Sequence, residues 1–144
     1  MKSKDDLVAN INKKPPRGIK ATGESYKVLI VDDSATMRKI IEQILKSEMY
    51  DICGEASDGD EALEKYKELN PDIITLDIHM PKVSGIQALS DILKFDPNAK
   101  VIMLTSEGQK ETVMEAVKMG AKNYIIKPPD RKNVLEKIEA VLNG

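Results

Sequence analysis

Hydrophobic residues from residue 27 onward follow two alternating patterns. Short apolar runs, such as residues 28–31, are typical of strands that are buried on both faces of a sheet. Each run is followed by a longer segment in which apolar residues recur at helical spacing. Proline, glycine or a capping residue separates most of these segments. The pattern predicts five strands, each followed by a helix, at residues 28–31, 50–56, 72–76, 100–104 and 123–126.

This alternation of strands and helices predicts the fold class. Parallel strands that are connected through helices by right-handed crossovers form a sheet with helices on both faces. A closed barrel would need eight such units, and 144 residues are too few for it. We therefore expect an α/β fold with an open, doubly wound, five-stranded parallel sheet.

Composition narrows the classes of function. The 22 basic and 24 acidic residues nearly balance, and the chain has no tryptophan and one phenylalanine. We therefore expect no nucleic-acid partner, which would need a basic surface or stacking aromatic rings. No apolar run approaches the length of a membrane span and no signal peptide is recognisable, so we expect a cytoplasmic protein without membrane contact.

The first 26 residues differ from the rest of the chain. They contain six basic residues against three acidic ones, and they have almost no periodic apolar pattern. We expect residues 1–26 to form a flexible basic tail and residues 27–144 to form the folded domain. A docking peptide for an acidic partner is the alternative interpretation of the tail.

Polar side chains follow four of the five predicted strands. In open parallel sheets, ligands bind beyond the carboxyl ends of the strands. The residues at these ends are Asp32, Asp33, Asp77, Thr105 and Lys127. Three carboxylates at one edge would repel each other unless a cation lies between them. Oxygen ligands favour Mg²⁺, with Mn²⁺ as an alternative.

These residue types together suit phosphoryl chemistry. An aspartate carboxylate can act as a nucleophile and form an aspartyl phosphate. A threonine hydroxyl and a lysine ammonium group can supply a hydrogen bond and a positive charge to the remaining phosphoryl oxygens. Each residue alone has an ordinary explanation, such as a helix cap or a solvated lysine. Their occurrence at one edge of the sheet favours a common site.

The motifs at these positions resemble those of the receiver domain of bacterial response regulators. They are residues 28–34, residues 77–81 with Gly85, Thr105-Ser106, and residues 124–128. Their order and spacing match over residues 27–144, and among receivers the chain is most similar to the stand-alone chemotaxis regulators. The resemblance implies a flavodoxin-like strand order, 2-1-3-4-5.

The resemblance also implies a role for each acidic residue. Asp77 would be the phosphoacceptor and would take its phosphoryl group from a histidine of a chemotaxis-type sensor kinase. Asp32 and Asp33 would bind Mg²⁺ together with the Asp77 carboxylate and the backbone carbonyl of His79.

Two further residues of the site would transmit the signal. Thr105 would hydrogen-bond to the phosphoryl group and Lys127 would pair with it, next to a Lys127–Pro128 bond that is typically cis in this family. The Thr105 hydroxyl would move inward after phosphorylation, and Tyr124 would turn into the vacated space. The partner, the flagellar motor switch protein, would bind a surface made of Tyr124, Val113, Val117, Ile126 and Val134.

Two positions depart from the family pattern. Pro129 stands where chemotaxis regulators often carry an aromatic residue, which leaves the pose of the partner open. His79 is the single histidine and follows the acceptor by two residues. We expect His79 and Glu107 to set the lifetime of the aspartyl phosphate, with a pH dependence near neutrality because histidine titrates there. The alternative for His79 is a solvated loop residue.

We therefore expect a phosphorylation-gated binding module rather than an enzyme, with catalysis limited to its own phosphorylation and dephosphorylation. The receiver pattern reaches the end of the chain, so we expect the receiver itself to be the output, as a monomer. A dedicated phosphatase is a further candidate partner. The alternatives are a relay intermediate or phosphate sink without motor binding, and a phosphatase of the haloacid-dehalogenase type. The latter family carries Asp-x-Asp on its first strand and a cap segment, whereas Asp32 and Asp33 are adjacent here.

Overall fold

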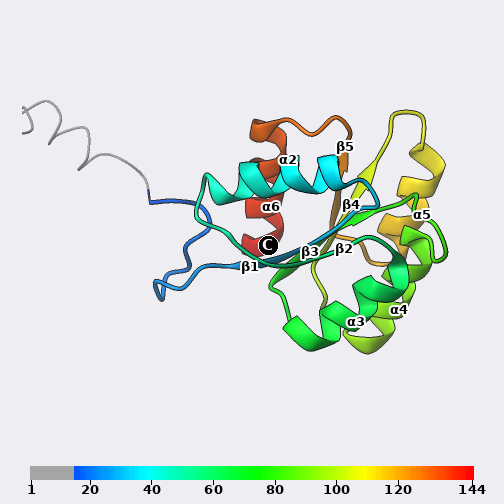
Figure 1. Ribbon diagram of the computed structural model, residues 1–144, viewed down its shortest axis with the longest axis horizontal. Coiled ribbons are helices and arrows are strands. Elements are labelled where there is room, and N and C mark those ends of the chain that lie inside the picture. Colours follow the sequence, from blue (N-terminus) through cyan, green and yellow to red (C-terminus); the bar gives the residue numbers. More distant parts are fainter. Residues whose placement is uncertain (1–14) are drawn as a thin grey trace, which may run out of the picture.

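The computed structural model describes residues 15–144, in which five strands alternate with five helices (Figure 1). The strands are β1 (Lys27–Val31), β2 (Asp51–Ala56), β3 (Ile73–Asp77), β4 (Val101–Thr105) and β5 (Asn123–Ile126). The helices are α2 (Ala35–Lys46), α3 (Gly59–Leu69), α4 (Gly85–Phe95), α5 (Lys110–Met119) and α6 (Arg131–Asn143). Among these described residues, no helix combines the length and hydrophobicity that a membrane span requires.

The five strands form one parallel sheet in the order β2-β1-β3-β4-β5. This order and the doubly wound architecture confirm the prediction. Asp77 and Thr105 are themselves the last residues of β3 and β4, one residue beyond the predicted strand ends. The backbone pairing of the sheet therefore holds both of these side chains in place.

Alternate residues of the central strands pack into two cores, one on each face of the sheet. Leu29 and Val31 of β1 lie in the cluster covered by α3, α4 and α5, whereas Val28 and Ile30 lie in the cluster covered by α2 and α6. Figure 1 shows these two groups of helices on opposite sides of the sheet. Both faces are buried in the central strands β1, β3 and β4, which explains why these strands are almost continuously apolar.

Four helices begin at a side-chain cap. Ser34, Asp58, Ser84 and Asp130 each accept a hydrogen bond from the backbone N–H three residues later, at 2.8–3.2 Å. Such a cap stabilises a helix by about 1 kcal/mol. Gln109 precedes α5 and makes no side-chain cap bond.

Residues 15–26 pack against the domain at the N-terminal edge of the sheet. The backbone N–H of Gly18 donates to the Glu48 carbonyl at 2.7 Å, and Gly18 is buried. Ion pairs add to this contact, from Arg17 to Glu139 at 3.1 Å and from Lys20 to Asp72 at 3.3 Å. For residues 15–26 these contacts replace the predicted flexible tail. Residues 1–14 lie outside the described residues, and for them the tail stays a prediction.

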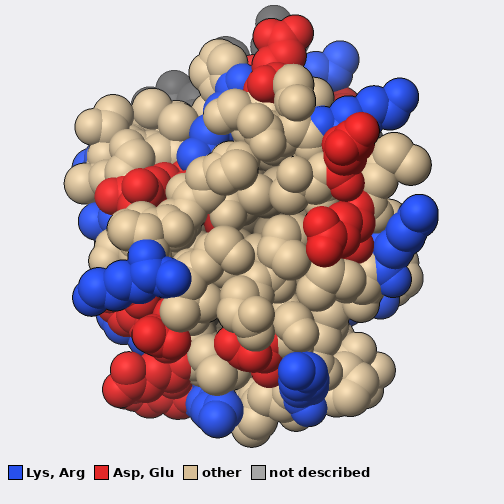
Figure 2. Space-filling view, turned by 90° about the vertical axis from the view of Figure 1, so that its right-hand side faces the viewer, with Lys and Arg blue, Asp and Glu red and all other residues tan. Residues whose placement is uncertain are grey.

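Charged side chains of both signs are mixed on the side of the molecule where α5 lies. Figure 2 shows them scattered around a wide uncharged area, with no broad basic patch on this face. The near balance of charge in the sequence is therefore also a local balance on this face. A nucleic-acid backbone would require the opposite, a continuous basic surface.

Candidate functional site

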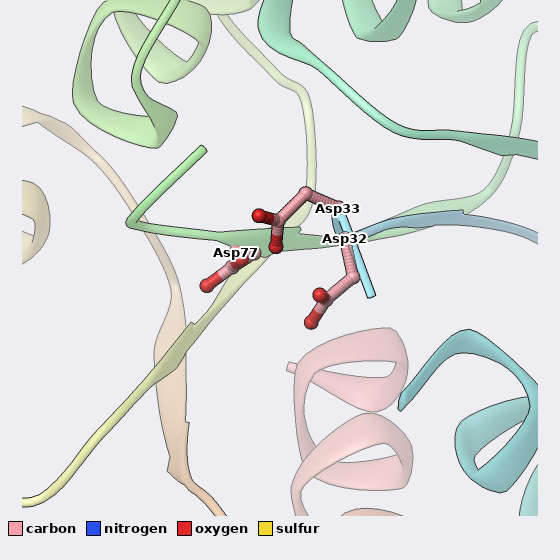
Figure 3. Close-up of side chains that lie close together, drawn as sticks. All are labelled: Asp32, Asp33 and Asp77. Carbon is pink, nitrogen blue, oxygen red and sulfur yellow. The ribbon is translucent and has the colours of Figure 1, made fainter. Parts of the chain in front are cut away.

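Three carboxylates meet at the C-terminal edge of the sheet. Asp32 and Asp33 directly follow β1, and Asp77 ends the neighbouring strand β3. Each offers one oxygen, and these three oxygens all lie within 4.8 Å of one another (Figure 3). Asp32 and Asp77 are 0% and 4% exposed, whereas Asp33 faces solvent. The predicted gathering of these acids is thus present in the structure.

Lys127 reaches the same place from the end of β5. Its ammonium group lies 2.8 Å from Asp32 Oδ2 and 3.2 Å from Asp77 Oδ1. The Lys127–Pro128 peptide bond is cis, as the resemblance implied. One cation against three carboxylates leaves the cluster with an excess of negative charge.

Burial and charge change the pKa values of two of these groups. Burial, together with the neighbouring Asp32 charge, raises the pKa of Asp77 from 3.8 to about 6, although Lys127 acts in the opposite direction. Burial alone would lower the pKa of Lys127, but its contacts with Asp32 and Asp77 outweigh burial and raise it. The cluster therefore favours the binding of a further positive charge, either a proton or a metal ion.

The donor set fits a hard divalent cation. Carboxylate oxygens at this spacing match the ligands of Mg²⁺ or Mn²⁺, whereas zinc would favour imidazole or thiolate ligands. Asp33 is exposed, so one side of the cluster is open to solvent and to phosphoryl oxygens. A metal role of the His79 carbonyl stays a prediction.

Thr105 lies at the end of β4, the strand between those that carry Asp77 and Lys127. The backbone N–H of Lys127 donates to the Thr105 carbonyl at 2.7 Å, and the Thr105 side chain is almost fully buried. Its hydroxyl donates to the Ser106 carbonyl at 3.2 Å. The hydroxyl must therefore exchange this bond for another if it is to donate to a phosphoryl oxygen.

A side-chain contact joins the two loops that follow β3 and β4. His79 Nε2 lies 3.0 Å from Gln109 Oε1, and the His79 backbone N–H donates to Asp77 Oδ1 at 3.4 Å. Glu107 is exposed on the same loop as Gln109. Sequence reasoning missed Gln109, whose signal was a long polar residue at a helix start where a short capping residue is usual.

An apolar groove of about 540 Å³ lies beside the site, between α5 and β5. Its exposed apolar residues include Met114, Val117, Tyr124 and Ile126. The β5 pair is exposed because alternate residues of this edge strand face away from the core. Thr105 also lines the groove, so the groove and the acidic cluster share one residue.

The predicted partner surface needs one correction and one adjustment. Val134 is fully buried in the core beneath α2 and α6, so it cannot contact a partner. Val113 is 7% exposed and lines the groove from within the core cluster. Both residues lie on the inner face of their helices, which the apolar pattern alone did not distinguish from the outer one. Met114, 49% exposed, is the apolar α5 residue that the prediction missed beside Val117.

Comparison with known proteins gives a consistent family. Residues 28–139 match the family described as response regulator receiver domain. The chemotaxis protein CheY of Treponema pallidum is 51% identical over 144 residues, which is 99% of each chain. The CheY of Thermotoga maritima is 50% identical over 115 residues, covering 80% of this chain and 96% of the relative.

A solved structure is similar to nearly the whole chain. The complex of CheX, CheY, BeF₃ and Mg²⁺ from Borrelia burgdorferi contains a chain that is 47% identical to this one, with a TM-score of 0.86. The match covers 89% of this chain and 98% of the other. With the parallel sheet, the acidic cluster and the family match in agreement, the chain belongs to the response regulator receiver family.

Proposed function

We propose that this receiver accepts a phosphoryl group on Asp77 from a histidine kinase of the chemotaxis type, in the presence of Mg²⁺. The phosphorylated form then signals by binding the flagellar motor switch protein. The observation that carries the proposal is the convergence of three carboxylates and Lys127 on one small site. The relatives from T. pallidum and T. maritima are chemotaxis proteins, which supports a role of this chain in chemotaxis.

Asp77 is the nucleophile in this proposal. One of its carboxylate oxygens forms a bond to phosphorus, and the bond from phosphorus to the kinase histidine breaks. The histidine nitrogen keeps the electron pair of that bond and takes up a proton. Asp32 and Asp33 would hold the metal ion, which supplies positive charge against the phosphoryl oxygens. Lys127, which directly follows β5, supplies a second positive charge to the phosphoryl oxygens.

The change on phosphorylation passes through Thr105 and Tyr124. The Thr105 hydroxyl exchanges its bond with the Ser106 carbonyl for one with a phosphoryl oxygen. Tyr124, 36% exposed and lining the same groove, then turns inward and reshapes the surface offered to the partner. Lys137 holds the outward position of this ring, because its ammonium group lies 4.4 Å from the ring centroid.

Two classes of protein partner follow from this function beside the kinase. The motor switch protein would bind the groove, where the apolar walls suit an amphipathic segment. A dedicated phosphatase would act at the acidic cluster, and CheX, which forms a complex with CheY in B. burgdorferi, is a model for such a partner. Cytoplasmic location and a monomeric state remain predictions from the sequence.

Radiolabelled phosphoryl transfer from a chemotaxis kinase tests the proposed chemistry. The wild-type chain should take up label with Mg²⁺ and lose this ability in excess chelator. Asp77→Asn should abolish transfer, whereas the control Asp60→Asn, at an exposed position on α3, should keep it. Transfer to the Asp77→Asn chain at the wild-type rate would disprove the proposal.

A binding assay separates motor signalling from the phosphate-sink alternative. The protein is activated with beryllium fluoride and Mg²⁺, and its affinity for the N-terminal segment of the motor switch protein is measured. We expect binding to strengthen on activation and to weaken in Val117→Ala. A chain that accepts phosphoryl groups but shows no binding in either state would instead be a relay intermediate or sink.

As a receiver it is a signalling protein rather than an enzyme, so the phosphatase alternative has no support.

A further inference from the structure

Two loops that flank the phosphorylation site are joined by one side-chain contact. His79 lies on the loop between β3 and α4, and Gln109 lies 30 residues later at the start of α5. His79 Nε2 and Gln109 Oε1 are 3.0 Å apart, a normal hydrogen-bond distance in which the ring N–H donates to the amide oxygen. We call this contact the latch. It joins the loop that follows Asp77 to the loop that follows Thr105.

The Gln109 end of the latch is fixed by the helix that it precedes. The backbone carbonyl of Gln109 accepts a hydrogen bond from Val113, which holds this residue at the first turn of α5. The other four helices begin with a serine or aspartate whose side chain binds the backbone. The Gln109 side chain makes no such bond and is directed to His79 instead.

The His79 end of the latch is fixed next to the reactive carboxylate. The His79 N–H donates to Asp77 Oδ1 at 3.4 Å, and the adjacent Ile78 is tied to β4 through the Leu104 carbonyl at 3.0 Å. The latch therefore connects the backbone beside Asp77 to the N-terminus of α5. Both of its ends are held by the main chain, so closing the contact orders few additional degrees of freedom.

We propose that Gln109 is a positioning residue whose contact with His79 slows hydrolysis of the aspartyl phosphate. In that hydrolysis a water oxygen bonds to phosphorus and the bond from phosphorus to the Asp77 oxygen breaks. The products are inorganic phosphate and a free carboxylate, and the protons of the water pass to phosphate or solvent. The latch holds the two loops together beside Asp77 and limits the room for that water. The inference rests on the proposed function, because it concerns the lifetime of the group on Asp77.

The kinetic test uses the full chain and four variants. Gln109→Met keeps the length of the side chain and removes the acceptor, and His79→Ala removes the donor. The double variant His79→Ala/Gln109→Met measures their coupling. Gln87→Met is the matched control, since Gln87 also makes one exposed side-chain hydrogen bond near a helix start, to Asp91 at 3.0 Å. Each protein is phosphorylated with acetyl phosphate and Mg²⁺, the donor is removed, and release of inorganic phosphate is followed.

We expect dephosphorylation of Gln109→Met to be about two- to fivefold faster than wild type, the effect of losing one exposed hydrogen bond. In the His79→Ala background, the Gln109→Met change should add nothing, because the latch is already absent. Gln87→Met should match wild type. An unchanged rate in Gln109→Met, or the same acceleration with and without His79, would overturn the proposal.

A second measurement tests the contact without phosphorylation. The chain has one histidine, so the NMR signals of its imidazole ring are unambiguous. Gln109→Met should shift these signals, whereas Gln87→Met should leave them unchanged; no shift in Gln109→Met means that the latch does not form. A wild-type chain that takes up no phosphoryl group refutes the proposed function, and the latch with it. Normal uptake with unchanged release in Gln109→Met refutes the latch alone.

Discussion

Replacing Asp77 by asparagine should stabilise the metal-free protein. Burial and the Asp32 charge raise the pKa of Asp77 from 3.8 to about 6, so the folded state disfavours the ionised carboxylate. This increase in pKa corresponds to about 3 kcal/mol at pH values where the group is ionised in both states. Lys127 loses one partner in the variant, at 3.2 Å, which offsets part of this gain. We expect a net stabilisation of about 1–3 kcal/mol near pH 8.

The stability difference between wild type and Asp77→Asn depends on pH. The folded-state pKa is raised, so the favourable contribution of protonated Asp77 is fully present below the unfolded-state value of 3.8 and is lost as the pH rises through about 6. Wild type therefore loses stability relative to Asp77→Asn over this window. The gap between the two should shrink by about 2 kcal/mol from about pH 8 to about pH 4.5.

Urea unfolding followed by circular dichroism, in excess chelator, measures both quantities. Asp60→Asn serves as the control, because its carboxylate is exposed and lies outside the acidic cluster. Adding Mg²⁺ should stabilise wild type more than Asp77→Asn, because the ion binds the folded cluster. An Asp77→Asn chain that is less stable than wild type near pH 8, or a gap that does not narrow on acidification, would refute the electrostatic reasoning.

Four further substitutions test other parts of the structure. Gly18→Ala should lower the free energy of unfolding by about 1–3 kcal/mol, because a Cβ at this position would lie 2.3 Å from the Tyr50 backbone nitrogen. Urea unfolding measures this change. Wild-type stability of the variant would mean that residues 15–26 do not pack as described. Lys127→Met should cost about 3 kcal/mol in chelator, because two buried carboxylates lose their cation. Unchanged stability would contradict the two ion pairs of Lys127. Val134→Ala should lower the free energy of unfolding by about 1.5–3 kcal/mol, because Val134 is fully buried. Val117→Ala should change stability by less than about 0.5 kcal/mol and weaken partner binding, because Val117 is exposed. The reverse pattern would contradict the buried position of Val134 and the exposed position of Val117.

The sheet and the acidic cluster were predictable because both follow from strong local signals. Continuous apolar strands that alternate with helical segments permit few topologies, and parallel strands bring their carboxyl ends to one edge. Asp32, Asp33 and Asp77 therefore met as expected. The sequence did not indicate that Asp32 is fully buried while Asp33 faces solvent. That difference depends on which direction the chain takes after β1, and adjacent residues carry no periodic signal for it.

Contacts between distant segments were the features that sequence reasoning missed. The packing of Gly18 against the Glu48 carbonyl depends on a close approach of two backbone segments. A glycine among polar residues does not by itself indicate such an approach. Val134 was placed on the partner surface because the resemblance implied a surface that includes this helix, but its side chain is fully buried. Gln109 and His79 meet through two loops, whose paths the hydrophobic pattern does not determine.

The central claim is that the clustered carboxylates direct a phosphoryl group to Asp77. The most direct measurement treats the phosphorylated protein with borohydride, which reduces an aspartyl phosphate to homoserine, and locates the altered residue by mass spectrometry. We expect homoserine at position 77 when Mg²⁺ was present and none when it was chelated. Homoserine at position 32 or 33 with an intact Asp77, or equal modification of Asp77 without a metal ion, would contradict it.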